Sequence, residues 1–305
     1  MDRQIRALQK KHVYIGTSSW KYPGWQGLIY KKNYKSEKAF KADCLPEYAE
    51  HFSALGVDHT FYSWPYPKTL QTYFDQTPED LRMGLKVTEK ITIFKYPKLK
   101  RYGKDAGKVN EDFLNADLFA EAFLDRLKPF KQRIGPVMLE FSQFYPGMLG
   151  SGKEFTDLLD RFLKKLKKRR EGFQLAVEIR NKNWLQKPYL QMLEQNQVAH
   201  VYNSWTRMPS LGEQLEATKE VTFPCIVSRV LLQPGTAYAQ AVKTFEPYNK
   251  VKKKQPQIRK DTAKLIQRAL NLKIPAYIFV NNRCEGCAPL TIQGILEELK
   301  KLKKL

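Results

Sequence analysis

Charged side chains stand near the ends of several short apolar segments of the chain. They are Lys86 in GLKVT, Glu140 in VMLEF, Glu178 and Arg180 in LAVEIR, and Arg229 in VSRVLL. A charge inside an apolar strand is costly unless it is paired with an opposite charge or contacts a ligand. Carboxylates beside cations are able to transfer protons and to stabilise a developing anion. We therefore predict that Glu178 is a general acid or base, with Glu140 as a second carboxylate and Lys86 as a catalytic cation.

The same charges have a purely structural interpretation. Glu178 and Arg180 fall on one face of their segment, because side chains alternate along a strand. Glu178–Arg180 and Lys86–Glu140 would then be salt bridges and nothing more. In that case neutral replacements of similar shape would reduce stability and leave ligand binding unchanged.

The five tryptophans all follow expected strands closely, and none lies in an expected helix. Aromatic side chains gathered on one face form a stacking surface for a ring-bearing ligand, either a sugar or a nucleobase. The alternative is a hydrophobic lid packed on top of the fold. The aromatic set comprises Trp20, Trp25, Trp64, Trp184 and Trp205, together with Tyr22, Tyr62 and Tyr66.

Two segments near the end of the chain suit an anionic group. LLQPGTAY (231–238) and NNRCEG (281–286) contain Gly235 and Gly286, which permit close backbone approach, and Arg283, which supplies charge. Glycine beside proline is also ordinary turn chemistry. The predicted substrate-binding residues are Trp20, Tyr22, Trp25, Tyr62, Arg180, Trp184, Arg229, Asn281, Asn282 and Arg283.

Eight short apolar or β-branched segments must position these residues, and stretches of helical periodicity alternate with them. The expected strands are 13–19, 57–62, 82–88, 137–141, 175–179, 198–203, 225–232 and 276–281. The expected helices are 45–55, 68–75, 112–128, 152–168, 187–196, 259–272 and 289–302. The connections are too long for hairpins, which favours parallel strands joined by helical crossovers.

This pattern predicts an α/β fold, a (β/α)₈ TIM barrel in a single domain over 13–305, after a polar N-terminal extension over 1–12. A doubly wound sheet is the main alternative, but GTSSWKYPGW lacks the glycine-rich phosphate loop typical of that fold. In a barrel, the strand ends that carry the charged and aromatic residues would form the site. The long connections 89–110, 205–224 and 233–257 would lie at the same end.

The composition narrows the class of protein. The 305 residues include 53 Lys+Arg against 31 Asp+Glu, a formal net charge of +22, with 42% hydrophobic residues. Such a chain can bury a large core, so it is not disordered, and it has no run of apolar residues long enough to span a membrane. Lysines in 161–170 fall opposite an apolar stripe, which indicates a solvated helix face. The alternative is an electrostatic surface for nucleic acid.

We expect neither a metal nor a cofactor. Cys284 and Cys287 form a single C-x-x-C pair, and the four histidines offer no second pair of ligands. The N-terminus lacks the apolar segment of a signal peptide, so we expect a cytoplasmic protein without membrane contact. The oligomeric state stays open.

The chain also resembles the YecE-like family, domain of unknown function family 72. The matching motifs, in order, are IGTSSWKYPGWQGLIY (15–30), HTFYSWP (59–65), GLKVTEKIT (84–92), AVEIRNKNW (176–184) and VNNRCEGCAP (280–289). The resemblance implies a TIM barrel and no established activity. Motif positions are matched by Trp20, Tyr22, Trp25, Tyr30, Phe61, Tyr62, Lys86, Glu178, Arg180, Trp184, Arg229, Asn281 and Asn282.

The chain departs from the family pattern at three places. Gly56 stands where many members have Glu, Glu140 stands where many have Gln, and Leu231 and Leu232 stand where many have a His. A mechanism that needs that His is therefore excluded. We predict an enzyme, a hydrolase or lyase, acting by acid/base chemistry on an anionic ring-bearing substrate such as a nucleotide, a nucleic-acid end or a phosphosugar. The alternatives are a non-catalytic nucleic-acid binding protein and a glycoside hydrolase.

Overall fold

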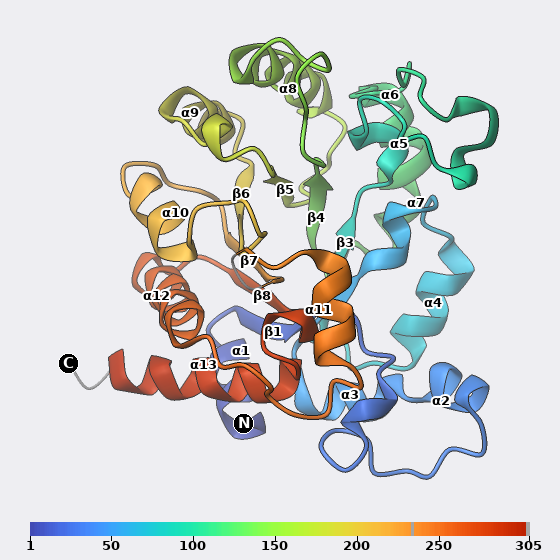
Figure 1. Ribbon diagram of the computed structural model, residues 1–305, viewed down its shortest axis with the longest axis vertical. Helices are drawn as coiled ribbons and strands as arrows, with labels where there is room; N and C mark the ends of the chain where they lie inside the picture. Colours follow the sequence, from blue (N-terminus) through green and yellow to red (C-terminus); the bar gives the residue numbers. More distant parts are fainter. Residues whose placement is uncertain (233–234, 303–305) are drawn as a thin grey trace.

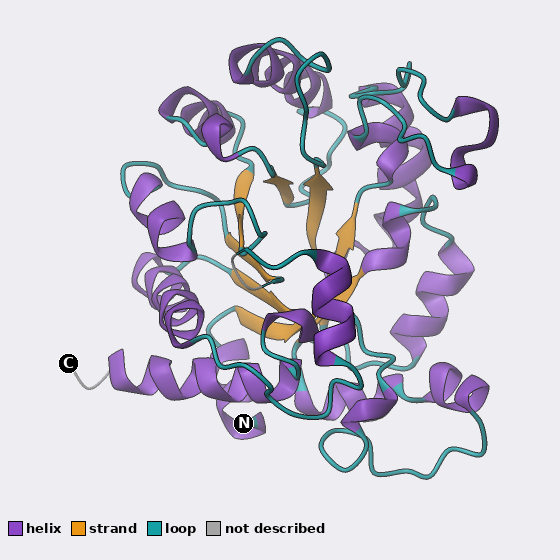
Figure 2. Ribbon diagram, viewed as in Figure 1, coloured by secondary structure: helices purple, strands orange, loops and turns teal. Residues whose placement is uncertain are grey.

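Eight parallel strands form a closed barrel in the computed structural model, which describes residues 1–232 and 235–302. The strands pair in chain order, and β8 pairs with β1 to close the ring (Figure 2). They are β1 (Val13–Thr17), β2 (Ala54–Val57), β3 (Arg82–Lys86), β4 (Ile134–Glu140), β5 (Leu175–Glu178), β6 (Ala199–Asn203), β7 (Ile226–Val230) and β8 (Ala276–Val280). The predicted single-domain TIM barrel is therefore confirmed.

Helices surround the strands on the outside (Figure 1). They are α1 (Asp2–Gln9), α2 (Glu37–Asp43), α3 (Leu45–His51), α4 (Pro67–Asp75), α5 (Glu89–Thr92), α6 (Ala116–Phe119), α7 (Asp125–Leu127), α8 (Gly152–Leu166), α9 (Lys187–Gln195), α10 (Leu211–Ala217), α11 (Tyr238–Phe245), α12 (Pro256–Leu272) and α13 (Ala288–Leu302). Short 3₁₀ turns span Pro23–Trp25, Asp58–Phe61, Lys100–Asp105, Lys128–Arg133, Lys182–Trp184 and Asn282–Cys284, and a π-helical stretch spans Ala120–Leu124.

Helix α8 shows how the sequence produces this layer. It begins after Ser151, whose hydroxyl accepts a hydrogen bond from the Glu154 amide at 3.1 Å and so satisfies a free donor of the first turn. Its apolar stripe is buried against the barrel, while the lysines that follow the stripe face solvent. This exposure agrees with the solvated helix face predicted for 161–170, and the alternative surface for nucleic acid would share it. The buried residues are Phe155, Leu159, Phe162, Leu163 and Leu166.

The second strand lies earlier than the sequence predicted. It covers Ala54–Val57, not 57–62, and the next residues form the 3₁₀ turn Asp58–Phe61. At the start of β2 the backbone lies close to β1, and a Cβ on Gly16 would lie 1.7 Å from the carbonyl oxygen of Ala54. The shift matters for the site, because it places Asp58 just beyond the carboxyl end of β2.

The first residues of the chain pack against the amino ends of the strands. In α1, Ile5 and Leu8 are buried. The Arg6 guanidinium donates to the carbonyl oxygen of Ala49 at 2.8 Å, and the Gln9 amide donates to that of Asp80 at 2.9 Å. This end of the barrel is thus covered, and the opposite end is left for the site. No helix within 1–232 and 235–302 has the length and apolar character needed to cross a membrane.

Candidate active site at the carboxyl ends of the strands

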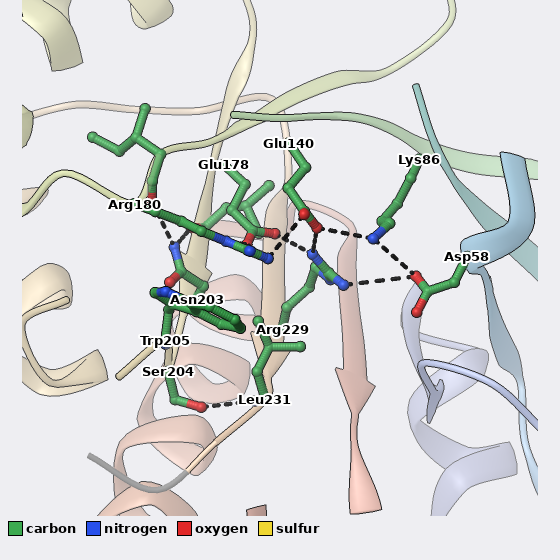
Figure 3. Close-up of polar contacts among 12 residues, drawn as sticks. Asp58, Lys86, Glu140, Glu178, Arg180, Asn203, Ser204, Trp205, Arg229 and Leu231 are labelled. Atoms are coloured by element: carbon green, nitrogen blue, oxygen red, sulfur yellow. Dashed lines mark hydrogen bonds and ion pairs between the residues drawn. The ribbon is translucent and has the colours of Figure 1, made fainter. Parts of the chain in front are cut away.

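An ionic cluster occupies the carboxyl end of the barrel (Figure 3). Lys86, Glu140 and Glu178 are the last residues of β3, β4 and β5. Arg229 lies one residue before the end of β7, and Glu140 and Glu178 are register partners on neighbouring strands. Parallel strands of a barrel present their carboxyl ends on one face, so the four side chains that the sequence singled out converge there.

Glu140 is the centre of this cluster. Its Oε2 accepts from Lys86 Nζ at 3.0 Å and from Arg229 Nη1, and its Oε1 lies 2.9 Å from Arg180 Nη2. Burial alone would raise the pKa of Glu140. The opposing charges of Arg180, Lys86 and Arg229 outweigh burial and hold that pKa well below its ordinary value of 4.5. Glu140 is therefore a carboxylate at neutral pH.

Glu178 lies deeper than Glu140 and is fully buried. Its Oε1 accepts from Nε and Nη2 of Arg180, both at 3.2 Å, and its Oε2 accepts from Arg229 Nη1. Burial would lower the pKa of Arg229, but the carboxylates of Glu178, Glu140 and Asp58 raise it. Both oxygens of Glu178 are therefore occupied, and this carboxylate holds two arginines in place.

Asp58 is a site residue that the sequence reasoning missed. Its Oδ1 lies 3.6 Å from Lys86 Nζ and 3.6 Å from Arg229 Nη2, and its side chain is 38% exposed. The strand predicted over 57–62 ran through it, so it was not recognised as a strand-end residue. With Asp58, the cluster holds three carboxylates (Asp58, Glu140, Glu178) and three cations (Lys86, Arg180, Arg229), and its charges balance.

A cavity of about 150 Å³ opens above the cluster. Among the predicted site residues, Lys86, Glu140, Arg180 and Arg229 contribute to its walls, and so do Tyr62, Asn281 and Arg283. Glu178 lies beneath the walls and does not line the cavity. The complete lining is Asp58, Tyr62, Lys86, Glu140, Arg180, Trp205, Arg229, Leu231, Leu232, Tyr238, Asn281 and Arg283.

Arg283 adds a further positive charge to this cavity. Its guanidinium lies 4.4 Å from the centre of the Tyr238 ring, and its Nη1 is 3.4 Å from Asn281 Oδ1. Its Nε is buried without a hydrogen-bond partner, and no carboxylate pairs with it within the described part of the chain. Because the other charges cancel, Arg283 leaves the cavity with one unbalanced cation.

Three aromatic residues surround the cavity. The Trp205 ring lies 3.8 Å from the Arg180 guanidinium, in cation–π contact. Tyr62 is 61% exposed and Tyr238 is 50% exposed, so both present ring surface at the rim. Of the predicted substrate-binding aromatics, Tyr62 lines the cavity. Trp205 belonged to the wider aromatic set, and Tyr238 was predicted only as the last residue of the segment LLQPGTAY, not as an aromatic contact.

The other predicted substrate-binding aromatics, Trp20, Tyr22, Trp25 and Trp184, do not line the cavity and pack against neighbouring side chains, whereas Tyr66 of the wider set is exposed. Trp184 stacks on Phe155 with ring centres 4.9 Å apart, and Trp20 and Trp25 are likewise buried. Tyr22 is half-buried 4.9 Å from Trp25, and burial is the main cause that raises its pKa to about 12. For these residues the packed lid that the sequence left as an alternative is the arrangement found.

The two segments expected to hold an anion differ from one another. Asn282 is a buried structural residue, because its Oδ1 accepts from Trp25 Nε1 at 3.2 Å and from the Ala288 amide at 2.7 Å. Gly286 has φ +113° and lies against the backbone of residues 250–252. A glycine is needed here because it adopts positive φ and has no Cβ to clash with that backbone. Part of LLQPGTAY, residues 233–234, lies outside the described residues.

The cysteines show no sign of chemistry. All four are free and buried. Burial raises the pKa of the Cys284 thiol and brings that of Cys287 to about 11, so both are protonated at neutral pH. Across 1–232 and 235–302, no group of three or more His, Cys, Asp or Glu side chains is arranged to hold a metal ion.

Comparisons with known proteins agree with the fold and the sequence motifs. A family model described as a protein of unknown function, DUF72, matches residues 14–305. The chain is 26% identical over 148 residues to UPF0759 protein YecE of Escherichia coli K12, and the match covers 48% of this chain and 44% of that protein. The chain thus spans less than half of that relative's length.

Solved structures show the same barrel. A DUF72 family protein of Enterococcus faecalis V583 has a TM-score of 0.62 at 17% identity, covering 94% of this chain and 95% of the other. A DUF72 family protein of Thermotoga maritima MSB8 has a TM-score of 0.59 at 17% identity, covering 95% and 99%. A D-tagatose 3-epimerase-like protein has a TM-score of 0.52 at 11% identity, covering 85% and 92%. At these identities the similarity establishes the fold alone.

Proposed function

The chain belongs to the DUF72 family, and we propose that it is an enzyme that binds a small anionic, ring-bearing substrate at the carboxyl end of the barrel. The observation that carries this proposal is the unbalanced cation of the cavity. Arg283 has a buried, unpartnered Nε on the cavity wall, and the other charges of the site balance once Glu178 beneath the wall is included. A bound anion would supply the missing partner, and a nucleotide or phosphosugar has such a group.

The size of the cavity defines how such a substrate would lie. A volume of about 150 Å³ is below the range of about 300–1,000 Å³ that is common for whole small-molecule sites. It accommodates a phosphate or carboxylate and its immediate neighbours. The ring would then rest at the rim, where Tyr62, Trp205 and Tyr238 offer stacking surface. A substrate with its charged end inward and its ring outward fits this arrangement.

The geometry also changes which residues suit acid/base chemistry. Glu178 does not line the cavity, and both carboxylate oxygens of Glu140 are occupied by Lys86, Arg180 and Arg229. Asp58 lines the cavity, is partly exposed and lies beside Lys86. We therefore assign Asp58 as the general base and Lys86 as the cation that steadies the developing anion. Glu140 and Glu178 become positioning residues for Lys86 and the arginines.

The test begins with thermal unfolding in the presence of paired compounds. Nucleoside monophosphates are compared with nucleosides, and glucose 6-phosphate with glucose. A ligand at 100 times its Kd stabilises the folded state by about 2.7 kcal/mol, so only the phosphorylated member of a pair should raise Tm. Turnover of the stabilising compound should be lost in Asp58→Asn and kept in the surface control Asp157→Asn. If no phosphorylated compound raises Tm, the proposed substrate class is wrong.

Nucleic-acid binding is a second candidate, and one surface favours it. Residues 95–108 contain six cations and a single carboxylate, Asp105. Within this segment Leu99 is 52% exposed, and the Arg101 guanidinium lies 5.1 Å from the ring of Tyr62 at the cavity rim. Affinity for a fluorescent oligonucleotide should fall steeply with salt, and replacing Lys98, Lys100 and Lys104 by Gln should flatten that slope. Absence of binding at low salt would exclude this candidate.

A glycoside hydrolase is not favoured by the site. That chemistry needs one carboxyl group that is protonated and ready to donate. The cations around Glu140 hold its pKa low, and Glu178 accepts hydrogen bonds on both oxygens. Neither strand-end carboxylate therefore meets the requirement.

A further inference from the structure

A second hollow lies on the same face of the barrel, beside the cavity. It has a volume of about 540 Å³ and is formed by the loops that follow β4, β5 and β6. Arg180 contributes to the walls of both spaces.

The groove is positively charged. Arg180, Lys182 and Arg207 line it, and Glu213 is its one carboxylate among the described residues. Glu213 is already engaged, because its Oε2 accepts from the backbone amide and the hydroxyl of Ser210, both at 2.7 Å. These bonds cap the first turn of α10. Arg180 is paired with Glu140 and Glu178, so the groove has Lys182 and Arg207 as its remaining cations against the single charge of Glu213, whose carboxylate caps the helix.

Two of these cations are available to a ligand. Lys182 and Arg207 are exposed, and neither has a carboxylate within 4.0 Å in the part of the chain that the structure describes. Arg207 Nη1 donates to the side-chain oxygen of Gln143 at 3.2 Å, so the β4 loop orients its guanidinium. The planar donor fork of an arginine held in this way suits a phosphate or carboxylate.

The partition between cavity and groove is a single stacked pair. Arg180 is fixed by Glu140 and Glu178 on one side and lies 3.8 Å from the Trp205 ring on the other. The Trp205 backbone amide donates to Asn203 Oδ1 at 3.2 Å, which holds the start of its loop. Figure 3 shows the Trp205 ring beside Arg180. A ligand that extends across this pair would contact both spaces, and the indole would offer a surface for its ring.

We propose that the groove is a second anion subsite and that the substrate carries two anionic groups. One group occupies the cavity at Arg283, the other lies in the groove at Arg207, and the ring spans the Trp205–Arg180 pair. The substrate class narrows to bis-anionic ring compounds, such as a ring with two phosphate groups. This inference rests on the proposed function, since it extends the same site.

Crystals soaked in selenate separate the groove from the cavity. Anomalous density in both spaces, beside Arg283 and beside Arg207, is the expected result. Density in the cavity alone overturns the second subsite and leaves the proposed function standing. Density in the groove alone overturns the function proposed for the cavity and, with it, the substrate with two anionic groups. Density in neither overturns both.

Calorimetry tests the subsite in solution, with inorganic tripolyphosphate as the long probe and inorganic phosphate as the short one. Arg207→Gln should weaken tripolyphosphate binding about tenfold, as expected for the loss of a charge-assisted hydrogen bond, and leave the binding of phosphate in the cavity unchanged. Lys187→Gln is the control, because it removes one surface charge that is paired with Glu220 outside the groove. The subsite is overturned if Arg207→Gln and Lys187→Gln reduce the affinity for tripolyphosphate equally. It is also overturned if Arg207→Gln reduces the affinities for tripolyphosphate and phosphate equally, or if the unmodified protein does not bind tripolyphosphate.

Discussion

Replacing Glu140 by Gln probes the ionic cluster where its contacts are most numerous. The substitution keeps the shape of the side chain and removes the carboxylate that contacts Lys86, Arg180 and Arg229. The cluster then holds two carboxylates and three cations, and with Arg283 nearby the cavity carries two unbalanced positive charges. We expect the folded protein to lose stability, because these cations are buried or nearly so.

The size of the loss follows from the partners that remain. Breaking a buried ion pair typically costs about 3–5 kcal/mol. After the substitution Lys86 still faces Asp58, and Arg180 still contacts Glu178. Arg229 keeps its contacts with both of these carboxylates. No cation is left without a carboxylate, so we place the loss at the lower end, about 3 kcal/mol. A surface pair is worth far less, about 0–1 kcal/mol.

Urea unfolding at pH 7, followed by tryptophan fluorescence, measures this loss. The control is Glu220→Gln, which removes an exposed carboxylate 3.5 Å from Lys187. The pKa of Glu140 is lowered in the folded state, so its contribution is complete above its ordinary pKa of 4.5 and is lost as the pH falls through the lower folded value. The difference between the wild type and Glu140→Gln should therefore shrink below pH 4.5. A loss at pH 7 no larger than that of Glu220→Gln, or a difference independent of pH, would refute the reasoning.

Three further substitutions distinguish packing from binding. Trp184→Ala should cost about 3–5 kcal/mol of stability in urea unfolding and leave ligand affinity unchanged, since Trp184 stacks on Phe155 away from the cavity. Trp205→Ala should do the reverse and weaken the binding of a ring-bearing ligand by about 1–3 kcal/mol in calorimetry, because the ring beside Arg180 is lost. Unchanged affinity would exclude that stacking role. Gly16→Ala should cost about 3 kcal/mol or more in urea unfolding, because the added Cβ would lie 1.7 Å from a carbonyl oxygen of β2; a stability equal to that of the wild type would show that the strands can separate.

The barrel was predictable because its signal is repeated eight times. Each strand is an apolar run, each crossover helix has its own periodicity, and errors in single boundaries do not change the architecture. The charged strand ends were predictable for a related reason. Lys86, Glu140, Glu178 and Arg229 are polar residues in segments that must be buried, and such residues stand out in a sequence.

The details of the site depend on contacts that no local pattern contains. Asp58 was missed because the segment 57–62 resembles a strand in the sequence, whereas β2 ends at Val57 and a 3₁₀ turn begins at Asp58. The aromatic residues were predicted as a group, but whether a tryptophan packs or faces a cavity depends on its neighbours in space. Trp184 meets a phenylalanine from α8, whereas Trp205 meets an arginine from the loop after β5.

The roles of the two strand-end carboxylates also needed the structure. The sequence shows that Glu140 and Glu178 can face one site, but not how many cations each accepts. Three cations around Glu140 and two arginines on Glu178 make both of them positioning groups in our account. Proton transfer is then assigned to Asp58, the one carboxylate of the cluster that is partly open to solvent.

The central claim is that Arg283 makes the barrel mouth an anion site. Its most direct test is a calorimetric titration of inorganic phosphate into the wild type, Arg283→Gln and the surface control Lys153→Gln, with circular dichroism to verify folding. We predict that the wild type and the control bind alike and that Arg283→Gln binds about tenfold or more weakly. Equal affinity in Arg283→Gln and the wild type, or no binding by the wild type, would contradict the account.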